Sequence, residues 1–125
     1  MYCTFKRGDW KFNSHDGVPN LEEMQAVVGG YIEPIDLWED EDGSVTLYVN
    51  EEGLYKCEPS LSVRNTRYHG DPLVRGDVVV VRTDFTDGET VSLKKEDLDR
   101  LTFLPGQFAF LTEDLDAPRM PILQL

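Results

Sequence analysis

The sequence contains few residues of the kinds that build metal centres. Its two cysteines, Cys3 and Cys57, and its two histidines, His15 and His69, lie too far apart in the sequence to form the short ligand pairs of a zinc site. We therefore expect two free thiols, no metal and no other cofactor.

Long apolar segments are also missing. No stretch approaches the roughly 20 consecutive apolar residues that a membrane-spanning helix needs. Residues 1–11 alternate aromatic with charged side chains, whereas a secretory signal carries a continuous apolar segment. We expect a cytoplasmic protein that does not contact a membrane.

Positive charge is scarce. The 125-residue chain has 12 basic and 24 acidic residues, which gives a net charge of -12. Because such a chain repels the phosphates of nucleic acids, we expect no direct binding to DNA or RNA. The acids either keep the protein soluble or present carboxylates in place of phosphates to a basic cleft on another protein. The net charge alone does not decide between these two interpretations.

The patterns that are present indicate a single domain. Residues 1–13 predict two short strands joined at a glycine turn, and residues 14–19 are loop formers. A short helix follows, because Asn20 and Glu23 have the spacing of a capping box and the double glycine at 29–30 ends the helix.

The remaining segments are predicted mainly as strands. Pro34 lacks the amide that a central ladder would need, so residues 31–38 form an edge or bulged strand. The four valines at 78–81 are typical of a strand buried on both faces. A second short helix is expected at 93–101. Further strands are expected at 45–49, 54–57 and 89–93, with residues 58–76 irregular and the apolar C-terminal tail docked on the domain.

Together these elements predict an α+β fold, in which two short helices pack on a mostly antiparallel sheet. Within this single domain, residues 1–19 form an N-terminal hairpin and loop, residues 20–101 the α+β core, and residues 102–125 a C-terminal arm.

The first candidate site is the hairpin turn with four consecutive acids. These are Glu39, Asp40, Glu41 and Asp42. An EF-hand can be excluded, because a loop with Gly43 at its sixth position would place Trp38 and Val49 where calcium ligands are required. We expect a solvated turn whose carboxylates contact a basic partner.

The second candidate site is a basic cluster between residues 64 and 75. Its members are Arg64, Arg67, His69 and Arg75. Because arginine forks suit phosphate and carboxylate groups, the cluster is a candidate anion-binding site. The other interpretation is that these residues pair with the protein's own acids.

No segment predicts catalysis. Ser14, His15 and Asp16 are the residue types of a catalytic triad, but triads are recognised by spatial geometry and not by adjacency in the sequence. The double glycine at 29–30 precedes a strand, whereas a phosphate-binding loop joins a strand to a helix. We therefore expect no catalytic residues and no enzyme.

Several motifs resemble a known family. They are Leu-Glu-Glu-Met-Gln-Ala-Val-Val-Gly-Gly-Tyr-Ile-Glu at 21–33, Val-Asn-Glu-Glu-Gly at 49–53, Gly-Asp-Val-Val-Val at 76–80 and Ser-Leu at 92–93. In this order they are similar to a family of small uncharacterised domains of bacteria, phages and plasmids. The resemblance implies an α+β fold and an origin in phage or mobile DNA, and it implies no active site. We interpret the first two motifs as scaffold.

Two functions follow as hypotheses. The leading one is a phage-type accessory protein that binds or inhibits a host protein, such as a defence or nucleic-acid-processing enzyme, through acidic surface in the host cytoplasm. The alternative is a module that binds a nucleotide or another small molecule through the loop from Arg64 to Arg75.

Overall fold

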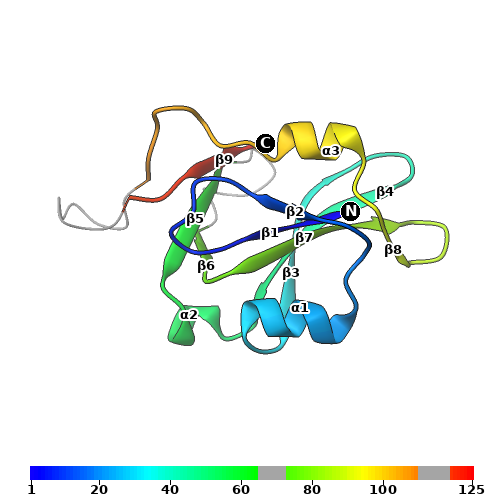
Figure 1. The fold of residues 1–125 in the computed structure, drawn as a ribbon, viewed down its shortest axis with the longest axis horizontal. Coiled ribbons are helices and arrows are strands. Elements are labelled where there is room, and N and C mark those ends of the chain that lie inside the picture. Colours follow the sequence, from blue (N-terminus) through cyan, green and yellow to red (C-terminus); the bar gives the residue numbers. More distant parts are fainter. Residues whose placement is uncertain (65–72, 110–118) are drawn as a thin grey trace.

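The computed structural model of the protein describes residues 1–64, 73–109 and 119–125. These residues form two sheets and three short helices (Figure 1). The larger sheet consists of β1 (Tyr2–Phe5), β2 (Asn13–His15), β3 (Ile32–Glu39), β4 (Gly43–Asn50), β7 (Val78–Asp84) and β8 (Thr90–Val91). The smaller sheet consists of β5 (Pro59–Arg64), β6 (Leu73–Arg75) and β9 (Ile122–Gln124). The helices are α1 (Leu21–Val28), α2 (Gly53–Lys56) and α3 (Lys95–Arg100).

The larger sheet is antiparallel throughout, with the strand order β2-β1-β7-β4-β3 and with β8 paired to β7. In the smaller sheet, β5 pairs antiparallel with β6 and parallel with β9. The predicted α+β fold with a mostly antiparallel sheet is therefore confirmed. The apolar C-terminal tail is docked as expected, and it contributes a strand of its own.

The valines of β7 organise the core. Successive residues of a strand face opposite sides of the sheet. Val79 and Val81 pack with Met24 of α1, whereas Val78 and Val80 belong to the main cluster, to which the smaller sheet also contributes. The larger sheet is thus covered by α1 on one face and by the smaller sheet on the other, as the sequence of four valines predicts.

Helix α1 begins and ends at the predicted residues. The side chain of Asn20 accepts a hydrogen bond from the Glu23 amide at 2.8 Å, and the Glu23 carboxylate accepts one from the Asn20 amide at 3.2 Å. Gly29 ends the helix with φ of 80°, a left-handed conformation that favours glycine. Of its apolar residues, Met24, Val27 and Val28 pack toward the sheet, whereas Leu21 is exposed.

Strand β3 is the edge strand that Pro34 predicts. It is last in the strand order, and its register with β4 shifts between Asp36 and Trp38 in a bulge. The hairpin that joins β3 to β4 turns at residues 40–42, as expected from Asp42 and Gly43.

The prediction of a strand at 54–57 is wrong, because these residues form most of α2. The amides of Tyr55 and Lys56 donate to the Glu52 carbonyl, and the amide of Cys57 donates to the Gly53 carbonyl. An ion pair between Lys56 and Glu52, one helical turn apart, supports this conformation. These local hydrogen bonds form a helical turn, so the segment does not pair with a neighbouring strand.

The prediction that residues 58–76 are irregular is also wrong in part, since β5 and β6 lie in this range. Leu61, Val63 and Val74 are buried in the main cluster, so pairing of the two strands removes their side chains from water. Pro59 is the first residue of β5, a position that tolerates proline. Similarly, β2 includes Ser14, which the sequence placed in a loop.

Within the described ranges, no helix is long and apolar enough to cross a membrane.

Candidate functional site

The acidic turn between β3 and β4 is held by an arginine from the central strand. Arg82 is only 3% exposed, and its Nη1 and Nη2 atoms donate to the two carboxylate oxygens of Asp40 at 3.0 and 2.8 Å. Asp40 also accepts hydrogen bonds from the amides of Asp42 and Gly43. The guanidinium of Arg82 is the main reason that the pKa of Asp40 lies well below its usual range.

A second carboxylate, from α3, completes this network. Asp97 is buried and accepts hydrogen bonds from Arg82 Nε at 2.8 Å and Arg82 Nη2 at 2.7 Å. The Trp38 indole and the Lys94 amide also donate to it, at 3.2 and 2.8 Å. Burial by itself would raise the pKa of Asp97, but these donors outweigh it and lower the pKa. The two carboxylates, Asp97 foremost, raise the pKa of Arg82.

The predicted partner-binding acids therefore divide into two pairs. Asp40 is bound to Arg82, and Asp42 lies 2.9 Å from the ammonium of Lys94, whose pKa it raises. Glu39 and Glu41 are exposed and form no ion pair with another described residue. Asp40 anchors the turn to β7, Asp42 is paired with Lys94 at the surface, and the side chains of Glu39 and Glu41 are exposed.

The predicted anion-binding residues do not converge within the described residues. Arg67 and His69 lie outside these residues. In the strand register, Arg64 at the end of β5 lies opposite Gln124 of β9. Arg75 of β6 lies opposite Pro59, which is the first residue of β5. Arg75 donates a hydrogen bond to the carbonyl of Cys57 at 3.2 Å. The register thus separates the two arginines by most of the length of a strand.

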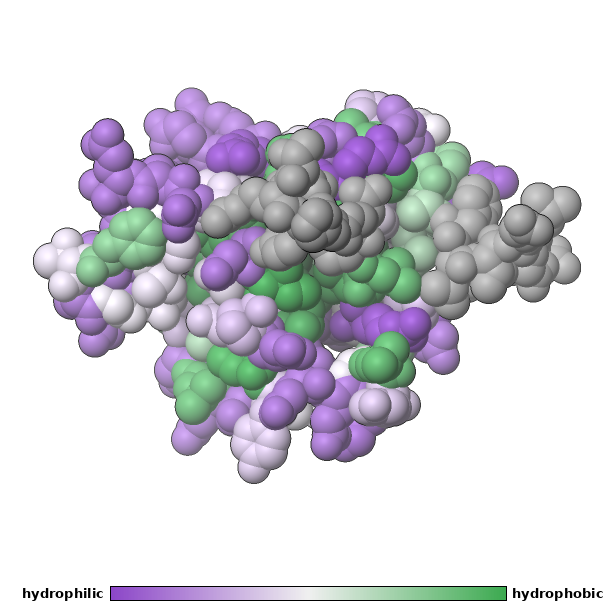
Figure 2. Space-filling model, turned by 180° about the vertical axis from the view of Figure 1, so that it is seen from behind, coloured by the Kyte–Doolittle hydropathy of each residue, from purple (hydrophilic) through white to green (hydrophobic). Residues whose placement is uncertain are grey.

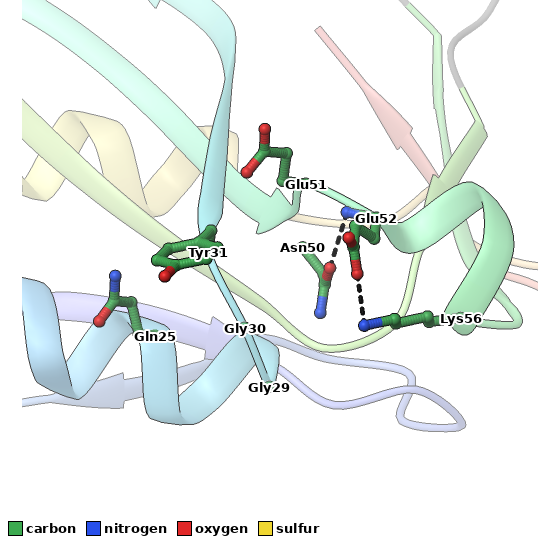
Figure 3. A pocket seen from close by; sticks show the side chains of 8 residues that line it. All are labelled: Gln25, Gly29, Gly30, Tyr31, Asn50, Glu51, Glu52 and Lys56. Atoms are coloured by element: carbon green, nitrogen blue, oxygen red, sulfur yellow. Dashed lines mark hydrogen bonds and ion pairs between the residues drawn. The ribbon is translucent and has the colours of Figure 1, made fainter.

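A cavity of about 380 Å³ opens where the end of α1 meets the turn between β4 and α2 (Figure 3). Eight residues line it: Gln25, Gly29, Gly30, Tyr31, Asn50, Glu51, Glu52 and Lys56. All of them except Lys56, which ends α2, come from the two sequence motifs at 21–33 and 49–53, which the sequence indicated as scaffold only. In Figure 3, Gln25 and Tyr31 lie on one side of the cavity, and Asn50, Glu52 and Lys56 lie on the other.

Asn50 connects the two motifs. It is buried, its Nδ2 donates to the Val28 carbonyl at 3.0 Å, and its Oδ1 accepts from the Glu52 amide at 2.8 Å. A β-carbon at residue 30 would lie 3.0 Å from Asn50 Nδ2, so glycine at that position gives the side chain its room. These hydrogen bonds of Asn50 therefore fix the backbone around the cavity.

Exposed hydrophobic side chains gather around this turn. Tyr31, Leu54 and Tyr55 are 74%, 67% and 87% exposed, more than any other large hydrophobic residue in the described part of the chain. Leu54 lines a second cavity of about 210 Å³ that shares Asn50 and Glu51 with the first. Exposed clusters of this kind are typical of interaction surfaces.

The opposite side of the molecule from the view of Figure 1 has a related character. Figure 2 shows hydrophobic residues toward the middle of this face and also in smaller groups nearer its edges, among hydrophilic residues.

The first cavity suits a cation better than an anion. Glu51 and Glu52 supply carboxylates, and the face of the Tyr31 ring attracts positive charge. Lys56 is the one cation among the described residues of the lining, and it is paired with Glu52, which raises its pKa. No group of three or more His, Cys, Asp or Glu residues among those described could hold a metal ion.

The residues of triad type do not assemble. Ser14 and His15 are successive residues of β2 and face opposite sides of the strand. His15 Nε2 lies 2.7 Å from the hydroxyl of Thr4, and its ring stacks on Tyr2. These contacts hold the imidazole against β1.

Two features of the site were not identified from the sequence. The Arg82 network had one signal in the sequence, because an arginine directly follows the four valines that are predicted to be buried. A buried arginine requires carboxylate partners. The cavity had no such signal, because it depends on the strand pairing that places Ile32 opposite Asn50 and so brings the two motifs together.

No curated protein and no solved structure is significantly similar to the chain. The family described as a domain of unknown function (DUF3846) matches residues 9–104. This range includes the acidic turn, the Arg82 network and both motifs around the cavity, and it leaves β1 and β9 outside. Because the match covers most of the chain, the protein is a member of the uncharacterised DUF3846 family.

Proposed function

We propose that the protein is a non-enzymatic binding protein that covers a basic surface of a host protein with its β3–β4 hairpin. The composition of the hairpin supports this proposal. Residues 31–55 contain no lysine, arginine or histidine, and they contain eight acids: Glu33, Asp36, Glu39, Asp40, Glu41, Asp42, Glu51 and Glu52.

The observation that carries the proposal is the position of several of these acids on or next to an edge strand. Strand β3 is last in the strand order, so among the described strands one side of the hairpin has no neighbour in the larger sheet. Three of the acids are held by cations: Asp40 by Arg82, Asp42 by Lys94 and Glu52 by Lys56. Four others are exposed and form no ion pair with a described residue: Glu33, Glu39, Glu41 and Glu51.

The edge favours contact through side chains over the addition of a strand. Pro34 has no amide to donate, and the bulge between Asp36 and Trp38 interrupts the ladder. Charged residues on an edge strand oppose pairing with another strand in the same way. A partner would therefore meet carboxylates, which attract lysine and arginine side chains over a distance set by the salt concentration.

The biological setting is part of the proposal. The resemblance to domains of phages and plasmids, together with the net charge of -12, supports an accessory protein of phage or mobile-element origin that acts in the host cytoplasm. Its target would be a defence or nucleic-acid-processing protein, whose basic cleft accepts carboxylates in place of phosphates.

The test is capture of a partner from bacterial lysate with immobilised protein in low salt. The wild type is compared with a triple variant, Glu33→Gln with Glu39→Gln and Glu41→Gln. We expect the wild type to retain a specific basic protein and the triple variant to lose it, because three exposed carboxylates of the edge are neutralised.

A matched control removes the same charge elsewhere. Asp16→Asn, Glu89→Gln and Asp99→Asn replace three exposed acids outside the hairpin. The control should retain the same protein as the wild type. The proposal fails if the wild type retains no specific protein, or if both triple variants lose the protein equally.

A further inference from the structure

We infer that the cavity between α1 and the β4–α2 turn is a socket for one arginine or lysine side chain of the partner protein. This inference rests on the proposed function and adds to it the point at which the partner is anchored.

The charges around the cavity select a cation. The Glu51 carboxylate is exposed and forms no ion pair with another described residue, whereas Glu52 is already paired with Lys56. Tyr31 lines the same cavity (Figure 3), and its carbonyl accepts a hydrogen bond from the Glu51 amide at 2.8 Å. A carboxylate next to an aromatic face binds a guanidinium or ammonium group through an ion pair and a cation–π contact together.

The size and rigidity of the cavity suit a side chain. Its volume of about 380 Å³ lies near the lower end of the range of ligand cavities, roughly 300–1,000 Å³. Asn50 holds the α1 end and the β4–α2 turn together through hydrogen bonds within the protein, so the backbone around the cavity is held in place. A preformed site costs less conformational entropy on binding.

The surroundings indicate that the cation belongs to a protein. Leu54 and Tyr55 of α2 are strongly exposed beside the cavity, and Tyr31 is exposed at its rim. Aromatic side chains at the centre of an interface contribute most of its binding energy. A free small cation would fill the socket but would leave these hydrophobic side chains in water.

The inference is tested by NMR titration of the full chain with a capped arginine, N-acetyl-arginine-N-methylamide. Capped citrulline, which has the same length without the charge, is the comparison ligand. We expect capped arginine to shift the amide signals of Gly30, Tyr31 and Glu51 at millimolar concentration, and capped citrulline to leave them in place.

Two variants and a control complete this experiment. Tyr31→Ala and Glu51→Gln should each weaken the binding of capped arginine, Tyr31→Ala by roughly two- to fivefold, the usual size of an exposed cation–π contact. Glu89→Gln removes an exposed acid outside both the cavity and the hairpin, and it should leave the affinity unchanged. Equal shifts with citrulline, or shifts spread over all acidic segments, would overturn the inference.

The socket and the proposed function can fail separately. If the captured host protein is lost with the edge variant but retained in full by the Tyr31→Ala/Glu51→Gln double variant, the socket is wrong and the acidic edge stands. If capped arginine binds as expected but no host protein is retained by the wild type, the proposed function is wrong. Both side chains are exposed, so the double variant should keep the native NMR spectrum.

Discussion

At the scale of single residues, Arg82 determines how the acidic turn is built. A guanidinium in the core is tolerated only when carboxylates neutralise it and accept its hydrogen bonds. Asp40 and Asp97 together occupy its Nε, Nη1 and Nη2 atoms. The contact with Arg82 therefore holds the most acidic segment of the chain against the central strand. It also fixes the orientation of the neighbouring residues Glu39 and Glu41.

Replacing Asp97 tests this role. Asp97→Asn leaves the buried charge of Arg82 only partly compensated, and we expect it to lower the free energy of unfolding by roughly 3–5 kcal/mol, measured in urea. Asp42→Asn is the matched control, because it removes an acid whose side chain is 75% exposed and whose partner Lys94 lies at the surface. Equal, small effects of the two variants would contradict the account.

Asp97→Asn should also change how the free energy of unfolding depends on pH. The pKa values of Asp40 and Asp97 are lowered in the folded state, so their stabilisation is fully present above the pKa of an unfolded aspartate, about 3.9, and is lost as the pH falls below it. The free energy of unfolding of the wild type should therefore decrease steeply as the pH falls below about 4. Asp97→Asn should show a shallower fall, and a parallel fall would argue against the network as its cause.

At the scale of elements, the β3–β4 hairpin is positioned by its contact with β7. A β-carbon on Gly43 would collide with the carbonyl oxygen of Thr83, which is backbone and cannot move aside. Gly43→Ala should therefore push the hairpin from β7 and cost roughly 1–3 kcal/mol or more, measured by chemical unfolding. Ser44→Ala, one residue further along β4, is the control and should change stability little. Gly43→Ala at wild-type stability would show that the hairpin is not pressed against β7.

The elements also differ in how far the sequence could predict them. Helix α1 and the edge strand β3 depend on local signals, namely the capping box at Asn20 and the missing amide of Pro34, and both were predicted correctly. The smaller sheet was missed because its strands are short and β9 comes from a distant part of the chain. Helix α2 was predicted as a strand because Leu54 and Tyr55 have β propensity, which the local hydrogen bonds of one turn override.

The candidate site could be predicted only in part for the same reason. The acids at 39–42 are visible in the sequence, but their division between structure and surface depends on Arg82, which is 42 positions away from Asp40. Likewise, Tyr31 and Glu51 approach each other only through the register of β3 with β4, where the Glu51 amide donates to the Tyr31 carbonyl at 2.8 Å. Neither motif alone predicts this long-range pairing of the two strands.

At the scale of the whole molecule, the 24 acids behind the net charge of -12 have different surroundings. Three acids of residues 31–55 are paired with Arg82, Lys94 and Lys56, whereas the exposed Glu33 and Glu39 lie on the edge strand β3. A field of one sign along an edge accelerates the approach of a basic partner and weakens with added salt.

The most direct test of this account is the dissociation constant of the captured complex as a function of salt concentration. We expect the wild type and the Asp16→Asn/Glu89→Gln/Asp99→Asn control to lose affinity steeply as salt rises. The Glu33→Gln/Glu39→Gln/Glu41→Gln variant should bind more weakly in low salt and depend less on salt, because fewer ion pairs form at the interface. An equal dependence on salt in all three proteins would contradict the claim that the acidic edge forms the binding surface.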